Sequence, residues 1–244
     1  MKPVSRISRI SLVIPAAGSG TRFGGPIPKQ LLPLKGRAVF LRSLDAFAGH
    51  VSEAVIAVSD DLRADIETLL INAGLPFPVR LTTGGATRQA SVYAGLLASD
   101  PTCDAILVHD AVRPLVPASC IAACIAALRD HVAAVVAVPC AATVKRARAD
   151  GTVDTTVARD DLWLAQTPQG LRRAEALAAF ARVVAENWSC SDDAQVMERA
   201  GHRVALVMGD ARNLKLTTPD DWAVAEALLG KVGTVGTVLG QNDV

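Results

Sequence analysis

Two basic side chains, Arg22 and Lys29, belong to a glycine-rich stretch near the start of the chain, PAAGSGTRFGGPIPKQ. Its glycines, Gly18 and Gly20 among them, would let backbone amides approach an anion without interference from side chains. Phosphoryl transfer is catalysed mainly by positioning and charge neutralisation, so two cations around one triphosphate could stabilise its transition state. A surface turn with two solvated charges is the alternative from these residues alone.

The spacing of the glycines excludes two common nucleotide-binding motifs. A dinucleotide fingerprint that starts at Gly18 would need glycine where Phe23 stands. A Walker loop that starts at Gly20 would need lysine where Pro26 stands. The sequence therefore favours neither a nicotinamide cofactor nor a P-loop mechanism.

Two later segments also carry polar residues with possible chemistry. In GGATRQAS, a helix start near Thr87 has free amides that could receive a nucleobase or phosphate, with plain helix capping as the alternative. In VHDAVRP, Asp110 follows an apolar run, where a buried carboxylate needs a cation or Mg²⁺ as partner. A structural pair between Asp110 and Arg113 is the other interpretation.

Apolar runs alternate with helical patterns along most of the chain. Strands are expected at 11–14, 54–58, 79–81, 105–108, 133–138 and 204–207. Helices are expected at 39–48, 62–70, 88–97, 118–128, 174–186, 192–200 and 219–229. This alternation predicts an α/β fold, a single Rossmann-like domain with a mostly parallel sheet, whose ligands bind at the carboxyl ends of the strands.

A β-hairpin arm is predicted at about 140–162, because alternating β-formers flank Asp150 and Gly151. An isolated hairpin is marginal in water, so we expect it to pack against a second subunit in a homodimer, or against its own domain. The predicted domain spans 1–230 and includes this arm. Residues 231–244 are rich in glycine and polar residues and are expected to form a flexible tail.

Composition limits the partners and the location of the protein. The formal net charge of +1 gives no broad attraction to nucleic acid. The sequence has no uninterrupted run of about 18 apolar residues, so we expect no membrane span. The five cysteines are scattered and lack C-x-x-C spacing, which argues against a disulfide framework and a zinc site. We therefore expect a soluble, cytoplasmic protein.

The motifs together resemble the 2-C-methyl-D-erythritol 4-phosphate cytidylyltransferase family. The resemblance is carried, in the family's order, by PAAGSGTRF, PKQLLPL, GGATRQASVYAGL, VHDAVRP, LAQTPQ and NLKLTTPDD. It implies a Mg²⁺-dependent nucleotidyltransferase that takes CTP and a small polyol phosphate. CMP would be transferred to 2-C-methyl-D-erythritol 4-phosphate, and pyrophosphate would be released.

The resemblance also implies roles for individual residues. The implied catalytic residues are Arg22, Lys29, Arg159 and Lys215. The implied nucleotide-binding residues are Ala16, Ala17, Gly18, Gly20, Gly85, Ala86, Ser91 and Asp110. The implied substrate-binding residues are Arg113, Thr143, Arg159, Thr167 and Lys215. Asp110 is also the implied metal ligand, and Arg88 is implied to support the loop that contains Gly85 and Ala86.

Two positions depart from the family pattern on the acceptor side. Ala142 precedes Thr143 and Ala158 precedes Arg159, where the family commonly has Asp. Ribitol 5-phosphate is therefore an alternative acceptor. A non-catalytic nucleotide-binding module is a further alternative, although such a module would not need cations on both the donor and the acceptor side.

Because an ionised phosphate is already a nucleophile, the implied reaction needs no general base.

Overall fold

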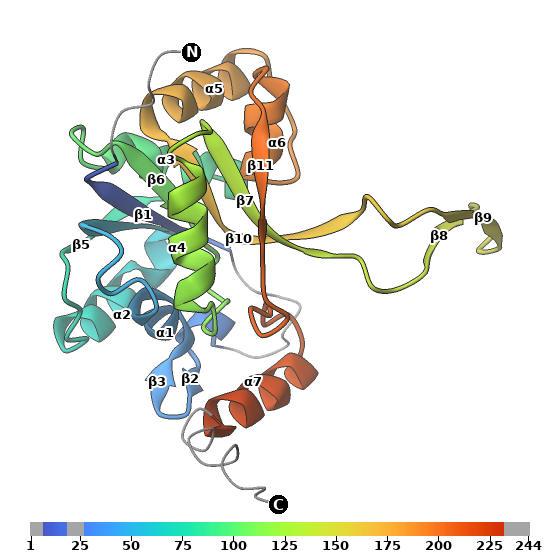
Figure 1. Cartoon of the computed structure of the whole chain (residues 1–244). Coiled ribbons are helices and arrows are strands. Elements are labelled where there is room, and N and C mark those ends of the chain that lie inside the picture. The colour runs from blue at the N-terminus through green and yellow to red at the C-terminus, as the bar shows by residue number, and fades with distance from the viewer. Residues whose placement is uncertain (1–6, 19–26, 232–244) are drawn as a thin grey trace, which may run out of the picture.

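The computed structural model describes residues 7–18 and 27–231, and its centre is a seven-stranded sheet of order β11-β7-β10-β6-β1-β4-β5 (Figure 1). The strands are β1 (Ile10–Pro15), β4 (Glu53–Val58), β5 (Val79–Thr83), β6 (Ala105–Val108), β7 (Ala133–Pro139), β10 (Trp163–Arg172) and β11 (Val204–Met208). Neighbouring strands run parallel except at β10, which is antiparallel to both β6 and β7. The predicted α/β class and mostly parallel sheet are confirmed.

Helices cover both faces of this sheet because successive side chains of each strand point to opposite faces. Leu12 and Ile14 of β1 join one core, which is completed by α1 (Val39–Asp45), α2 (Asp60–Ile71) and α4 (Ala118–Ala127). Val13 joins a second core, which is completed by α3 (Arg88–Ala98), α5 (Arg173–Ala185) and α6 (Asp193–Arg199). A strand buried on both faces must be apolar throughout, which is why these strands were visible as continuous apolar runs.

A third, smaller core lies beside the carboxyl end of the sheet. It contains Leu34, Val39, Val112, Leu216 and Ala225. These residues come from the first short hairpin and helix, from the loop after β6 and from the C-terminal part of the chain. Leu34 ends β2 (Pro33–Leu34), Val39 begins α1, and Ala225 lies in α7 (Pro219–Lys231). The short η2 (Lys29–Leu31) precedes β2, and β3 (Arg37–Ala38) pairs with it. This core therefore links the segment that follows Lys29 to the segment that follows Lys215.

The predicted arm is formed by β8 (Val144–Ala147) and β9 (Val153–Val157), which pair antiparallel. Gly151 in the turn has a φ of +83°, a conformation that glycine adopts without strain. Both strands are mostly exposed, and Figure 1 shows the arm extending away from the sheet. The alternative that the hairpin folds back on its own domain is therefore wrong.

Strand β10 was not predicted. Its sequence, WLAQTPQGLR, is polar and contains Pro168, which argues against a central strand. The structure accommodates Pro168 where the pairing with β7 is irregular, between Ala165 and Gln169. Because β10 runs against its neighbours, the chain re-enters the sheet from the arm at the edge where the parallel strands end.

The C-terminal tail predicted for 231–244 falls almost wholly outside the described residues, since α7 ends at Lys231. The division into a domain at 1–230 and a tail stays a prediction. None of the helices within 7–18 and 27–231 is long and apolar enough to span a membrane.

Candidate active site

A cleft of about 290 Å³ opens at the carboxyl ends of β1, β5 and β6. Its lining comes from the loops after these three strands, from η2 and from the loop before α7. The lining residues are Pro15, Ala16, Ala17, Gly18, Lys29, Gln30, Gly85, Ala86, Thr87, Arg88, Ser91, Asp110, Ala111, Val112 and Lys215. Many of the predicted nucleotide-binding residues, together with Lys29 and Lys215, are thereby brought to one place.

Gln30 braces the loop after β1. Its side chain is only 3% exposed, and Nε2 donates to the carbonyl oxygens of Ala16 at 3.2 Å and Gly18 at 3.1 Å. These bonds hold two loop carbonyls, and Lys29 next to Gln30 also lines the cleft. Gln30 was not predicted as a site residue, and its one sequence signal is that it directly follows Lys29.

The loop after β5 is built around Ser91. The Ser91 hydroxyl donates to Thr87 O at 2.9 Å and accepts from Gly85 N at 3.1 Å, while Thr87 Oγ1 caps α3 by accepting from Ala90 N. A Cβ atom at Gly85 would lie 2.4 Å from the Cβ atom of Ala90, so glycine is required for this close approach. Helix capping by Thr87 is therefore confirmed, and the same segment lines the cleft, while its binding of a nucleobase or phosphate stays a prediction.

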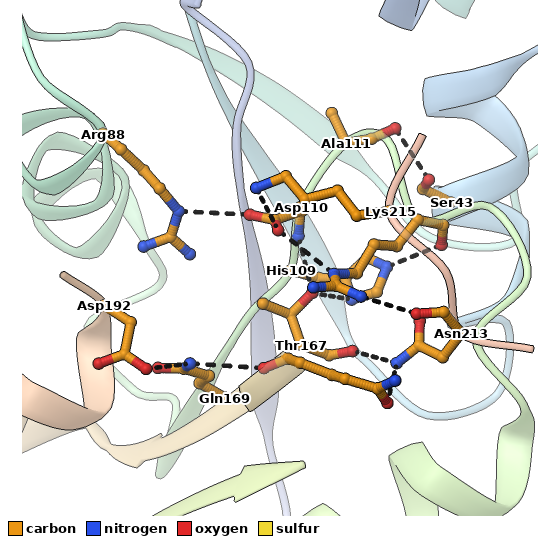
Figure 2. A network of polar contacts seen from close by, with 12 residues as sticks. Ser43, Arg88, His109, Asp110, Ala111, Thr167, Gln169, Asp192, Asn213 and Lys215 are labelled. Atoms are coloured by element: carbon orange, nitrogen blue, oxygen red, sulfur yellow. Dashed lines mark hydrogen bonds and ion pairs between the residues drawn. The ribbon is translucent and has the colours of Figure 1, made fainter. Parts of the chain in front are cut away.

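Asp110 is the centre of a cluster of three cations. Its Oδ1 lies 3.3 Å from Arg88 Nε, and its Oδ2 lies 3.3 Å from Arg113 Nε and 3.0 Å from Lys215 Nζ. Figure 2 shows Arg88 and Lys215 approaching Asp110 from opposite sides. Burial raises the pKa of Asp110, but the positive charges of Arg88, Lys215 and Arg113 outweigh it and hold this pKa well below its usual range.

Arg88 links the cleft to α6 through an ion pair with Asp193. Arg88 Nη1 and Nη2 lie 3.1 and 2.9 Å from the two carboxylate oxygens of Asp193, which is 1% exposed. Such a bidentate pair fixes the orientation of the guanidinium as well as its position. The predicted support role of Arg88 thus has a defined partner, which the sequence did not identify because Asp193 is remote along the chain.

His109 is completely buried behind Asp110 and is held in one tautomer. Its Nε2 lies 3.1 Å from the carbonyl oxygen of Arg113, which can only accept, so Nε2 carries the proton. Nδ1 then accepts from the Thr167 hydroxyl at 2.9 Å, and the same hydroxyl accepts from Asp110 N at 3.1 Å. Burial lowers the pKa of His109 to about 4, so the ring is neutral near neutral pH.

A family model for 2-C-methyl-D-erythritol 4-phosphate cytidylyltransferase (IspD) matches residues 10–231. The chain belongs to this family. It is 44% identical over 230 residues to the family enzyme of Deinococcus radiodurans, covering 94% of each chain. It is 42% identical over 223 residues to that of Symbiobacterium thermophilum, covering 90% of this chain and 92% of the relative. The resemblance inferred from the motifs is confirmed.

Solved structures of cytidylyltransferases of this family have the same fold. The 4-diphosphocytidyl-2C-methyl-D-erythritol synthase of Anaerococcus prevotii superposes with a TM-score of 0.79 at 31% identity and covers 91% of this chain and 98% of its own. The 2-C-methyl-D-erythritol 4-phosphate cytidylyltransferase of Thermus thermophilus gives 0.75 at 33% identity, with the same coverage.

Other predicted substrate-binding residues of the cytidylyltransferase do not line the cleft. Arg113 is buried beside Asp110, and the Thr167 hydroxyl is already occupied by His109 and Asp110. Thr143 and Arg159 are exposed at the base of the arm, where Arg159 Nη1 donates to Ala141 O. Gly20 and Arg22 lie outside the described residues. Thr143 and Arg159 are therefore not among the described residues that line this cleft, and their substrate-binding roles stay predictions.

The donor atoms of the cleft do not fit a Mg²⁺ ion held by the protein alone. Within the part of the chain that the structure describes, no group of three or more His, Cys, Asp or Glu could hold a metal ion. Asp110 is the one carboxylate among the described lining residues, and both of its oxygens already contact cations. Mg²⁺ prefers several oxygen ligands, which one charge-balanced carboxylate does not supply.

Proposed function

We propose that this chain transfers CMP from CTP to 2-C-methyl-D-erythritol 4-phosphate, a step in isoprenoid precursor biosynthesis. The products are 4-diphosphocytidyl-2-C-methyl-D-erythritol and pyrophosphate. One observation carries the proposal beyond family membership. Lys29 and Lys215, which come from opposite ends of the sequence, line the same cleft with Asp110. A site that brings two anionic substrates together needs cations at both ends.

The proposed reaction is a direct displacement at the α-phosphorus of CTP. An oxygen of the acceptor phosphate forms the new P–O bond, the bond to the β-phosphate breaks, and its electron pair leaves with pyrophosphate. In this proposal Lys29 neutralises charge at the α-phosphate, and Lys215 holds the acceptor phosphate. Both roles reduce the repulsion between the two substrates. His109 is excluded as a base because it is buried and both ring nitrogens are engaged.

Mg²⁺ enters this proposal as part of the nucleotide substrate. The triphosphate would supply most of the oxygen ligands that the ion requires, as is common for nucleotide-bound Mg²⁺. Asp110 could add one carboxylate oxygen only if one of its contacting cations moved toward a phosphate. Removal of Mg²⁺ should therefore abolish turnover without unfolding the protein. Pyrophosphate release and a melting curve, each with and without a chelator, would test the two parts of this expectation.

We further propose a homodimer in which the arm of one subunit reaches the cleft of the other. The proposal is supported by the exposed position of Thr143 and Arg159, away from the cleft of their own subunit. In a symmetric dimer each arm could supply these residues to the partner. We also propose a cytoplasmic location, which agrees with five cysteines that are all free.

The activity is tested by measuring pyrophosphate release with each of CTP, ATP, GTP and UTP. For the acceptor, 2-C-methyl-D-erythritol 4-phosphate and ribitol 5-phosphate are compared side by side with CTP. We expect turnover with CTP and methylerythritol phosphate. A higher kcat/KM with ribitol 5-phosphate would contradict the acceptor assignment, and no pyrophosphate with any pair would favour a non-catalytic nucleotide-binding module.

The dimer is tested by mixing two inactive variants, Lys29→Ala and Arg159→Ala. A mixed dimer contains one site with an intact Lys29 in one subunit and an intact arm from the other. Random exchange of subunits should therefore restore about a quarter of the wild-type activity. If the mixture stays inactive although subunit exchange is demonstrated by native mass spectrometry, the shared site is wrong.

A further inference from the structure

Asn213 lies two residues before Lys215 and is completely buried. Its Nδ2 donates to the carbonyl oxygen of Thr167 at 2.7 Å and to Gln166 Oε1 at 3.1 Å. Its own backbone carbonyl accepts from Arg113 Nη1 at 2.7 Å. One residue thus ties the loop before α7 both to β10 and to the loop after β6, as the contacts around Asn213 in Figure 2 illustrate.

The orientation of the Asn213 amide is fixed by its neighbours. Gln166 Nε2 donates to the carbonyl oxygen of Asp210 at 3.0 Å, so Gln166 presents its oxygen to Asn213. The Thr167 carbonyl is an acceptor as well, and Asn213 must turn its NH₂ group toward both. Its Oδ1 is then buried without a hydrogen-bond partner among the described atoms. This unpaired oxygen reduces the stability that the residue contributes, but it does not relax the constraint on the loop.

The chain is also fixed on the other side of Lys215. Leu216 N donates to the carbonyl oxygen of Val112 at 2.9 Å, and the Leu216 side chain is fully buried in the third core. The backbone of Lys215 is therefore held between two anchored residues, while its side chain is 41% exposed. A lysine is a point charge on a flexible stem, so the position of its backbone decides which atoms its ammonium can reach.

We infer that Asn213 is a positioning residue for Lys215, holding the loop so that the lysine reaches the acceptor side of the cleft. The inference rests on the proposed function, because only there is Lys215 assigned to the acceptor phosphate. Asn213 is not among the described residues that line the cleft, so it acts through Lys215 rather than on the substrates. Its effect should appear in the kinetics of the acceptor and not in those of CTP.

The test is a double-mutant cycle with Asn213→Ala, Lys215→Ala and the combined variant. Pyrophosphate release is measured with methylerythritol phosphate varied at saturating CTP, and with CTP varied at saturating acceptor. Asn213→Ala should lower kcat/KM for the acceptor by about tenfold or more, since misplacing a substrate-binding group can be that costly. The KM for CTP should stay within about twofold, and the combined variant should be no worse than Lys215→Ala. Effects that multiply, or an equal loss toward CTP, would overturn the inference.

Glu53→Ala is the matched control for loss of stability. Glu53 is nearly buried at the amino end of β4 and has three partners, with Ser11 Oγ at 2.7 Å, Asp100 N at 2.6 Å and Arg80 Nη2 at 2.6 Å. It lies at the edge of the sheet opposite the cleft. Glu53→Ala should lower the melting temperature as Asn213→Ala does but keep the acceptor kinetics. The same kinetic loss in both variants would show a general effect of stability and would refute the role of Asn213.

Gln166→Leu provides a second route if Asn213→Ala does not fold. It removes the acceptor for one of the two Asn213 bonds and leaves the bond to the Thr167 carbonyl, so it should weaken acceptor use in the same direction but less. Unchanged acceptor kinetics in Gln166→Leu would then count against the inference. A wild-type protein that releases no pyrophosphate would instead contradict the proposed function, so the two failures are distinguishable.

Discussion

The Lys215 ammonium lies 3.0 Å from Oδ2 of Asp110, although the two residues follow different elements in distant parts of the chain. The other oxygen of the same carboxylate faces Arg88 at 3.3 Å. Asp110 thus balances positive charge from the proposed nucleotide side and the proposed acceptor side of the cleft at once. Phosphates that enter the cleft would compete with this carboxylate for both cations.

Asp110→Asn should therefore destabilise the protein without ligand and increase the stabilisation that a bound anion gives. Loss of the buried charge leaves Arg113 and Lys215 without their carboxylate, which should lower the free energy of unfolding by about 2 kcal/mol. Pyrophosphate should then raise the melting temperature of the variant more than that of the wild type. Urea unfolding and thermal melts with and without pyrophosphate measure both effects. Equal stabilisation of the two proteins would refute the competition.

Lys29→Ala should lower kcat by roughly a hundredfold or more without unfolding the protein, because a group that stabilises charge in a transition state contributes on that scale. Steady-state pyrophosphate release and circular dichroism measure activity and fold. Lys35→Asn is the control, since it removes an exposed lysine from the same part of the chain and Asn tolerates the φ of +48° at that position. Near-normal turnover of Lys29→Ala would exclude its catalytic role.

Two glycine substitutions should separate folding from nucleotide binding. No described atom lies within 4 Å of a Cβ built at Gly18, so Gly18→Ala should change the free energy of unfolding by less than about 0.5 kcal/mol yet raise the KM for CTP. At Gly85 the added Cβ would lie 2.4 Å from Ala90 Cβ. Gly85→Ala should therefore raise the KM for CTP and also lower the free energy of unfolding by about 1–3 kcal/mol. Urea unfolding and CTP titration test the pair, and an unchanged KM in Gly18→Ala would contradict its place in the nucleotide site.

His109 should make the protein less stable in mild acid. Burial lowers the pKa of His109 from 6.5 to about 4, so between these values the unfolded chain binds a proton that the folded chain does not. Stability is therefore lost as the pH falls through this range, by roughly 2 kcal/mol between about pH 7 and about pH 5. His109→Gln keeps a donor for Arg113 O and removes the titration. Its free energy of unfolding should decline less over this range, and an identical decline would refute the assignment.

The fold was largely predictable because its strands bury both faces. Continuous apolar runs and short connections located β1, β4, β5, β6 and β7 and the helices between them. Strand β10 escaped because its polar residues and Pro168 are acceptable only beside its irregular pairing with β7. The direction of the arm was likewise left open, since a hairpin pattern specifies its own pairing and not the surface that it faces.

The cleft residues were predictable where they belong to short motifs, as with Lys29, Gly85 and Asp110. The residues that orient them were not. Asp193 pairs with Arg88, and Asn213 accepts a hydrogen bond from Arg113, in each case across about a hundred residues of sequence. Polar side chains of this kind have no local pattern that separates them from surface residues. Only the folded chain brings such pairs together.

The arm leaves from the end of β7 and returns at the start of β10, and these two strands are direct neighbours in the sheet. The segment between them forms only the arm. Because Pro139 at the end of β7 pairs with Trp163 at the start of β10, a short linker could replace this segment. In the proposed dimer, folding and assembly would therefore be encoded in separable stretches of this polypeptide. We expect a chain shortened at the arm to give an intact monomeric core.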